Sequence, residues 1–226
     1  MKMGLFRKRW YPLIKPLCRP TIVWDFNGTL LNDVQACLNA LNTLLKMRHL
    51  RPITLSYYRE NFGFPVIQFY EHLGMIPCDA EDWAVIGETF HMRYLFSKTL
   101  QLQPGALEMV TLLHQKGYRQ GVLSALEQGL LELQLAQFGL ANKMDFVLGS
   151  RSYDGASKLE AAATLNLKEP VLLIGDTAHD AEVAKKQGWE CILCSAGHQT
   201  KQRLKACGFP VVERLDALAS MIIDRG

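Results

Sequence analysis

The pattern of apolar and polar positions opens with a run of four apolar or β-branched residues, Thr21 to Trp24, which leads into Asp25 and breaks at Asn27-Gly28. Such a run, bounded by a turn signal, predicts a buried strand that ends abruptly. Residues 34–47 then carry apolar side chains at helical spacing, and Asp33 is placed to cap that helix. From Thr21 the chain is therefore expected to form a strand, a tight turn and an amphipathic helix.

From about residue 35 to residue 100 the pattern stays helical and rich in aromatic residues, and no segment is typical of a strand. After the first helix, we expect helices over about 56–61, 66–73 and 82–95. Breaks at 63–65 and 74–77 separate them.

Strands and helices alternate from Gln103-Pro104-Gly105 to the end of the chain. We expect strands over 119–125, 144–150, 170–176, 190–196 and 210–213, and helices over about 106–116, 127–138, 158–165, 178–187, 200–206 and 214–223. This alternation predicts an α/β fold, a doubly wound parallel sheet covered by helices on both faces. The expected division is a basic extension over 1–20, a core made of 21–34 and 101–226, and an inserted helical segment over 35–100.

Composition and charge leave this picture in place and exclude some partners. The chain has 226 residues, of which 49% are hydrophobic, enough for a sizeable core. Its net charge is +3, and the first twenty residues carry +6 of positive charge, so the remainder has −3. The basic pI thus comes from the extension, and we expect no nucleic-acid partner.

No apolar run approaches the roughly 18 residues that a membrane span needs. Pro12, Lys15 and Pro16 interrupt the apolar residues of the extension, so it does not resemble a signal peptide. We therefore expect a cytoplasmic protein. The extension is interpreted as a strap packed along the body or a loose tail, with contact to a membrane surface or a partner as the alternative.

Six cysteines are scattered through the chain, so reduced thiols are expected rather than a disulfide framework. Cys191 and Cys194 form a CxxC pair inside an expected strand, where residues three apart point to opposite faces. Core packing is thus favoured over metal binding or redox chemistry.

Polar residues follow several of the expected strands: Asp25 the first, Ser124 the second and Asp176 the fourth. Ligands bind at this edge of an open α/β sheet. Two carboxylates there repel each other unless a cation neutralises them, and hard oxygen ligands suit Mg²⁺. Asp180 lies one helical turn after Asp176, and the charge of Lys158 would reach the same crevice.

Four motifs in this order, DFNGTL, LSA ending in Ser124 and Ala125, Lys158 and GDTAHD, resemble those of the haloacid dehalogenase superfamily of aspartyl-nucleophile hydrolases over nearly all of residues 21–200. The resemblance implies that Asp25 attacks phosphorus and forms an aspartyl-phosphate. Its implied site residues are listed by role: Asp25, Asp176 and the backbone carbonyl of Asn27 would hold Mg²⁺; Thr29, Ser124 and the amide of Ala125 would bind phosphate; Lys158 would neutralise charge; Thr177 and Asp180 would surround the metal ligands.

The helical segment resembles the family's cap, which closes over the crevice and chooses the substrate. Arg59 and the 61–65 loop, or His72 and Arg93, are candidates to face the leaving group, with an ordinary surface position as the alternative for each.

One position departs from the family's phosphatases. They carry a second aspartate two residues after the nucleophile as general acid and base, and here that residue is Asn27, whose amide cannot exchange the proton. Asp33, His179 and His198 are candidate substitutes, and Ser195 lies near the same crevice.

Sequences with this DxN motif resemble a phosphoglycolate-phosphatase-like subgroup with helical caps. A dehalogenase would carry Tyr at the Asn27 position, and a phosphonoacetaldehyde hydrolase Ala together with a lysine in the cap's loop region. Only Lys46 and Lys98, at the edges, lie between 35 and 100, so both activities are disfavoured.

The sequence thus predicts a Mg²⁺-dependent phosphatase of small phosphorylated metabolites. A catalytically impaired protein that binds a phosphate ligand and signals through cap closure is the alternative. Either a monomer or a homodimer is compatible with the chain.

Overall fold

The computed structural model describes residues 19–150, 158–168 and 170–223, so residues 1–18 of the basic extension lie outside the described residues. Six parallel strands form the main sheet in the order β5-β4-β1-β6-β7-β8. The strands are β1 (Thr21–Trp24), β4 (Gln120–Glu127), β5 (Phe146–Ser150), β6 (Val171–Gly175), β7 (Glu190–Cys194) and β8 (Val211–Val212). The predicted α/β class is confirmed.

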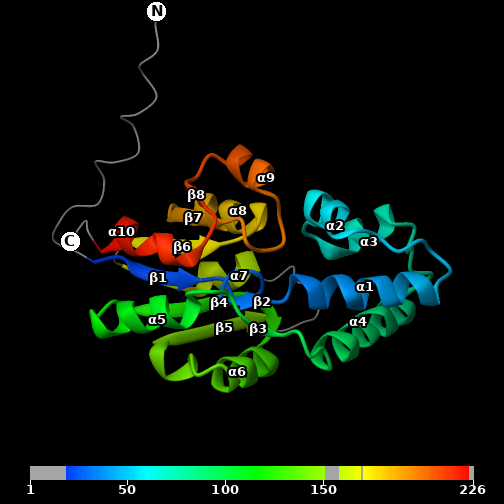
Figure 1. Cartoon of the computed structure of the whole chain (residues 1–226), viewed down its shortest axis with the longest axis horizontal. Helices are drawn as coiled ribbons and strands as arrows, with labels where there is room; N and C mark the ends of the chain where they lie inside the picture. Colours follow the sequence, from blue (N-terminus) through cyan, green and yellow to red (C-terminus); the bar gives the residue numbers. More distant parts are fainter. Residues whose placement is uncertain (1–18, 151–157, 169, 224–226) are drawn as a thin grey trace, which may run out of the picture.

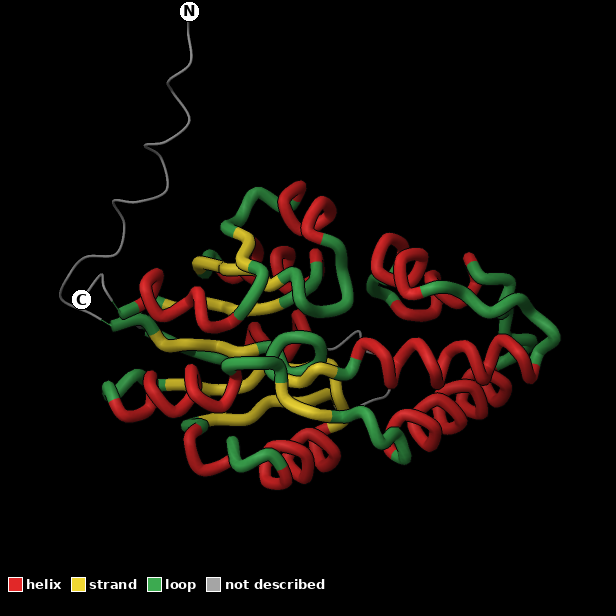
Figure 2. Tube along the Cα trace, in the orientation of Figure 1, coloured by secondary structure: helices red, strands yellow, loops and turns green. Residues whose placement is uncertain are grey.

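Helices cover both faces of this sheet (Figure 2). One face packs against α5 (Ala106–Gln115), α6 (Gln128–Gln137) and α10 (Leu218–Ile222), and the other against α7 (Lys158–Thr164), α8 (Ala178–Gln187) and α9 (Lys201–Ala206). β1 shows why: Ile22 and Trp24 join the first apolar cluster, whereas Val23 joins the second. Alternate strand residues point to opposite faces, so a buried strand is apolar throughout.

The same alternation places the two cysteines of the CxxC pair on opposite faces of the sheet. Cys191 is buried in one cluster and Cys194 in the other, and both are free thiols. Their interpretation as core residues on opposite faces is confirmed.

Four helices follow the first strand and lie together at one end of the molecule, beyond the carboxyl end of β1 (Figure 1). They are α1 (Val34–Met47), α2 (Leu55–Asn61), α3 (Val66–His72) and α4 (Ala80–Leu95), and we call them the cap. The chain enters the cap after β2 (Leu31–Asn32) and leaves it before β3 (Gln101–Leu102), and these two short strands pair antiparallel. We place the division between cap and core at this pair, which the periodicity did not reveal because each strand has two residues.

Two expectations about elements are wrong. The last segment is a 3-10 turn, Leu215–Ala217, followed by a short α10, rather than one helix over 214–223. Asp33 occupies the N-cap position of α1 but makes no side-chain cap hydrogen bond, because its carboxylate contacts other groups. Within the described residues, no helix is both long and apolar enough to cross a bilayer.

Candidate active site

Three carboxylates meet at the carboxyl ends of β1 and β6. Asp25 follows β1, Asp176 follows β6, and Asp180 lies in the first turn of α8. One oxygen of each lies within 4.8 Å of the others. The parallel pairing of β1 with β6 brings the two strand ends together, as the sequence predicted.

Lys158 supplies the positive charge between these carboxylates. Its Nζ donates a hydrogen bond of 2.6 Å to Asp25 Oδ1 and a shorter one to Asp180 Oδ1. All three side chains are almost fully buried. Although burial opposes the charged ammonium, Asp180 and Asp25 raise the pKa of Lys158.

The carboxylates respond differently to this environment. Burial raises the pKa of Asp25 despite its contact with Lys158, and burial raises the pKa of Asp176 well above its ordinary value. For Asp180, burial is outweighed by Lys158 and Thr177, so its pKa is lowered. The lowered pKa of Asp180 favours its ionised form beside Lys158, whereas burial outweighs the nearby positive charge in raising the pKa values of Asp25 and Asp176.

Thr177 and Asp180 also begin α8. Thr177 caps the helix by accepting from the Asp180 backbone, and Asp180 Oδ2 accepts from the Thr177 backbone at 3.0 Å and hydroxyl at 2.6 Å. This reciprocal capping box orients the Asp180 carboxylate, so its other oxygen faces Lys158.

Thr29 lies behind the carboxylates. Its buried hydroxyl is 3.1 Å from Asp25 Oδ2 and 3.2 Å from Asp176 Oδ1. Thr29 does not line the cavity between cap and core, so its predicted phosphate contact stays a prediction, and its observed contacts are with Asp25 and Asp176.

Ser124 and Ala125 line the same cavity as Asp25, between cap and core. Ser124 Oγ donates to Asn27 Oδ1 at 3.3 Å and accepts from the Leu126 backbone at 3.1 Å. The structure therefore places Ser124 in the same cavity wall as Asp25 and links it to Asn27, the position that departs from the family pattern.

The side chain of Asn27 is held in place by the carboxylate of Asp33. Asn27 Nδ2 donates to Asp33 Oδ2 at 2.8 Å and to the Tyr94 hydroxyl at 2.9 Å, and Tyr94 in turn donates to Asp33 at 2.9 Å. The backbone of Gly28 donates to the other Asp33 oxygen at 2.8 Å. Asp33 thus fixes the turn that follows Asp25 and connects it to α4 of the cap.

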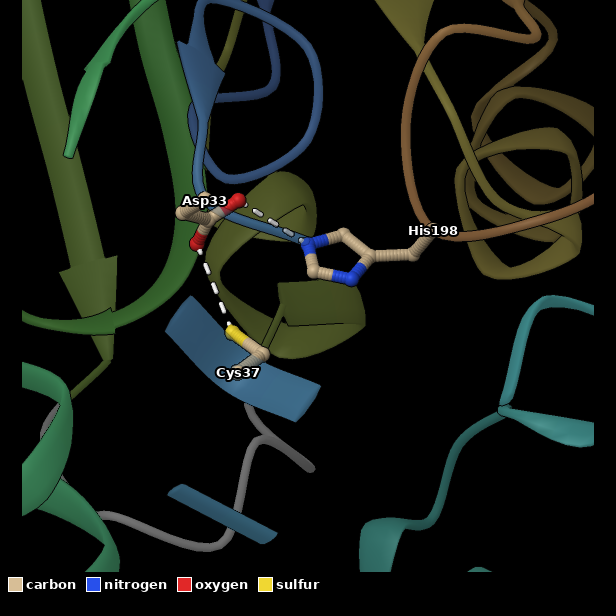
Figure 3. A group of neighbouring side chains, drawn as sticks. All are labelled: Asp33, Cys37 and His198. Carbon is tan, nitrogen blue, oxygen red and sulfur yellow. Dashed lines mark hydrogen bonds and ion pairs between the residues drawn. The ribbon is translucent and has the colours of Figure 1, made fainter. Parts of the chain in front are cut away.

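His198 completes this group. Figure 3 shows its ring beside one oxygen of the Asp33 carboxylate, with Cys37 beside the other oxygen. Nε2 is 3.1 Å from Asp33 Oδ1, and Nδ1 is 2.9 Å from the hydroxyl of Tyr58 on α2. Burial opposes the charged ring, but Asp33 and Asp176 raise the pKa of His198 to about 9.

Asp33, Cys37 and His198 also have atoms that could ligate a metal ion, and these atoms lie within 4.8 Å of one another. Both Asp33 oxygens and both His198 nitrogens already have protein partners, however. We therefore interpret the group as a hydrogen-bonding hub between cap and core.

A cavity of about 170 Å³ lies between the cap and the carboxylates. The core contributes Asp25, Asn27, Asp33, Ser124, Ala125, Leu126, Lys158, Asp176, Thr177, Asp180 and His198. The cap contributes Cys37, Leu41, Tyr58, Phe62, Phe64, Val66, Tyr70, Trp83, Gly87, Phe90, His91 and Tyr94.

Other predicted candidates lie outside the cavity wall. His72 and Arg93 are exposed. Arg59 donates to the backbone carbonyls of Ser195 and Gln199, so it joins the cap to the core instead of facing a ligand. The 61–65 loop contributes Phe62 and Phe64 to the wall.

His179 packs its ring 4.9 Å from the Phe64 ring, and burial together with Lys158 lowers its pKa. It is not a wall residue. Sequence reasoning missed Tyr58 and Tyr94, because nothing in the helical pattern shows that these two cap tyrosines reach His198 and Asp33.

The family model of haloacid dehalogenase-like hydrolases matches residues 22–194. This range includes every site residue named above except Ser195, His198 and Gln199. The chain belongs to this hydrolase family. Among curated proteins, this hydrolase is 28% identical over 191 residues to a phosphoglycolate phosphatase of Cereibacter sphaeroides, covering 80% of this chain and 87% of that protein.

It is also 23% identical over 172 residues to a pyrophosphatase of Listeria welshimeri, covering 73% and 78% of the two chains. A solved structure described as a predicted phosphatase from Clostridium acetobutylicum superposes with a TM-score of 0.78 at 20% identity, over 92% of this chain and 99% of that one. At this identity the structural likeness supports the fold.

Proposed function

We propose that this hydrolase is a Mg²⁺-dependent phosphatase of small phosphorylated metabolites that works through a phosphorylated Asp25. The observation that carries the proposal is the position of Asp25 on the cavity wall, 2.6 Å from Lys158 Nζ and beside Asp176. Phosphoryl transfer needs an in-line nucleophile and positive charge around the phosphoryl oxygens. The phosphatase relatives support the same reaction class.

The donor set fits Mg²⁺. Asp25 and Asp176 are buried carboxylates whose pKa values burial raises, so a divalent cation between them would restore the ionised forms. Asp25, Asp176 and the backbone carbonyl of Asn27 would hold the ion, which would neutralise charge on the phosphate. Thr177 and Asp180 would support these ligands through the capping box.

The residues of the chain then divide the reaction between them. An Asp25 carboxylate oxygen forms a bond to phosphorus while the bond from phosphorus to the leaving oxygen breaks, and that oxygen departs with the electron pair. Lys158 neutralises the nucleophile and phosphoryl group, while Ser124 and the amide of Ala125 bind phosphoryl oxygens. Water then cleaves the phosphorus–oxygen bond to Asp25 and releases phosphate.

Asn27 limits the first step, because its amide cannot give a proton to the departing oxygen. General acid catalysis is worth typically ~10² to 10⁴ in rate. We therefore expect the best turnover with substrates whose leaving groups depart without protonation, such as phenolates.

Hydrolysis of p-nitrophenyl phosphate tests the proposal. We expect steady turnover with Mg²⁺ that is lost with EDTA and in Asp25→Asn, while the exposed Asp216→Asn control keeps the wild-type rate. Binding of phosphate without turnover by the wild type would instead favour a regulatory binding protein, to which the amide of Asn27 also points.

A further inference from the structure

The cavity wall that faces Asp25 from the cap is aromatic and contains no lysine or arginine. The cap backbone, residues 34–95, lies wholly within the described residues, and none of its lysines or arginines lines the cavity. Phe62, Phe64, Trp83 and Phe90 are only half-buried by protein, which leaves their apolar surfaces to be covered by a ligand. Cavities lined in this way bind apolar groups.

The aromatic rings are held in place by one another. Tyr58 stacks on Phe62 with ring centroids 5.0 Å apart, and Phe62 meets Phe64 edge-on at 5.6 Å. Tyr70 in turn meets Trp83 edge-on at 5.9 Å. Such pairs keep the wall preorganised, so little side-chain entropy is lost when a ligand enters.

Three polar groups of this wall already have protein partners. The Tyr58 hydroxyl contacts His198, the Tyr94 hydroxyl contacts Asp33 and Asn27, and His91 Nδ1 lies 2.7 Å from the Gly87 carbonyl oxygen. A carboxylate placed against the wall would lose its hydration without gaining a lysine or arginine partner from the described cap residues that line it, which is costly.

We propose that the substrate of this site is a phosphate ester whose leaving group is a small uncharged apolar alcohol or phenol about one ring in size, and that esters with a carboxylate on the leaving group are rejected. This inference rests on the proposed function and adds the substrate class. It separates the chain from the phosphoglycolate phosphatases among its relatives, whose named substrate carries a carboxylate. The size follows from the cavity of about 170 Å³, below the roughly 300 to 1,000 Å³ of drug-sized ligand pockets.

A matched pair of esters tests the inference: 3-isopropylphenyl phosphate and 3-carboxyphenyl phosphate. Isopropyl and carboxylate groups have similar shapes, and at the meta position they leave phenols of similar acidity, so charge is the main difference. With Mg²⁺ and the wild-type protein, we expect kcat/KM for the isopropyl ester to exceed that for the carboxy ester by about 30-fold or more. The kcat/KM for the isopropyl ester should also be no lower than that for phenyl phosphate.

A charge introduced into the wall should reverse this preference. Val66 lines the cavity at the start of α3, whereas Val85 on α4 is exposed and does not line it. We expect Val66→Lys to raise the kcat/KM of the carboxy ester relative to the isopropyl ester by about tenfold. Val85→Lys adds the same charge outside the cavity and should leave the ratio unchanged.

The outcomes separate the two proposals. If the protein hydrolyses phenyl phosphate but has equal kcat/KM for the isopropyl and carboxy esters, or a higher kcat/KM for the carboxy ester, the proposed substrate class is overturned. The phosphatase proposal then still stands. Hydrolysis of none of the three esters, and of no p-nitrophenyl phosphate, overturns the phosphatase proposal and the substrate class with it. The wild-type comparison decides the matter even if Val66→Lys does not fold.

Discussion

At the scale of single residues, Asn27 and Asp33 form an amide–carboxylate pair at the position where phosphatases of the family carry an acid. Asn27 Nδ2 donates to Asp33 Oδ2 at 2.8 Å, and although burial opposes ionisation, His198, Asn27 and Tyr94 lower the pKa of Asp33. An ionised Asp33 therefore requires a donor, not a second carboxylate, at position 27.

This pairing predicts the result of restoring the acid. Asn27→Asp alone should not raise kcat, because the new carboxylate faces Asp33, and it should lower the free energy of unfolding by about 1 to 3 kcal/mol. The double variant Asn27→Asp with Asp33→Asn exchanges the two groups, and we expect it to recover stability and raise kcat on alkyl phosphates at least tenfold. Urea unfolding and steady-state kinetics measure both effects. A tenfold gain in the single variant would contradict the pairing argument.

His198 predicts a pH dependence of stability. Its pKa is about 9 in the folded protein against an ordinary value of 6.5, so the folded state binds the proton more tightly than the unfolded state. The resulting stabilisation, up to about 3 kcal/mol, is complete below pH 6.5 and is lost as the pH rises through 9. The difference in unfolding free energy between wild type and His198→Gln should therefore shrink over this range. A difference that stays constant with pH would show that the ring is neutral in the folded protein.

Residues at strand ends were the predictable part of the site. Asp25, Lys158, Asp176 and Asp180 converge as expected, because parallel strands end at one edge and a helix returns to its own face after one turn. The role of Asp33 was not predictable, since a carboxylate before a helix usually caps it. Its actual partners, Tyr94 and His198, come from segments 61 and 165 residues away.

At the scale of elements, the turn between β1 and β2 depends on Gly28. Its φ is +79°, and a Cβ atom there would collide with the Asp176 carboxylate and the His198 ring. The turn therefore lets the backbone approach β6 and the loop after β7 closely.

Gly28→Ala should consequently destabilise the protein by more than 1 kcal/mol, because alanine strains the backbone at this positive φ. It should also reduce Mg²⁺ affinity, because the added Cβ would collide with the Asp176 carboxylate. Gly87 is the matched control: it lies inside α4, and nothing approaches its missing Cβ within 4 Å. Gly87→Ala should leave stability unchanged or raise it by about 0.5 to 1 kcal/mol. Thermal unfolding and Mg²⁺ titration report both variants. Equal stability in the two would refute the close-approach argument.

Elements with a strong period and a clear boundary were predicted well. The expected helices over 34–47 and 178–187 match α1 and α8. Helix α1 ends at Met47, and Gly188 is the C-cap residue of α8. The β2–β3 pair is too short to create a period, and the final segment breaks into a 3-10 turn and a short helix despite its helical pattern.

At the scale of the whole molecule, cap and core meet around the cavity through polar contacts on two sides. Tyr58 and Arg59 bond to the 195–199 segment, and Tyr94 bonds to Asp33 and Asn27. The pairing between cap and core, and with it the aromatic wall, could not be predicted from one sequence, because helical periodicity shows which face is apolar but not what that face meets.

The carboxylate cluster predicts that Mg²⁺ stabilises the whole fold. Ion binding to the folded state alone adds about 2.7 kcal/mol at a concentration 100-fold above Kd, which should raise Tm by several degrees. The increase should disappear with EDTA and in Asp176→Asn, while Asp216→Asn, exposed and remote from the cluster, retains it. An unchanged Tm in the wild type over millimolar Mg²⁺ would argue against a metal site at this cluster.

The most direct test of the central claim is chemical trapping of the phosphorylated enzyme. The protein is mixed with p-nitrophenyl phosphate and Mg²⁺ and quenched, and the acyl phosphate is reduced with borohydride, which converts a phosphorylated aspartate to homoserine. Peptide mass spectrometry should then find homoserine at position 25, dependent on substrate and absent from Asp25→Asn. Release of phosphate with no modification at position 25, or with homoserine at another aspartate, would contradict the account.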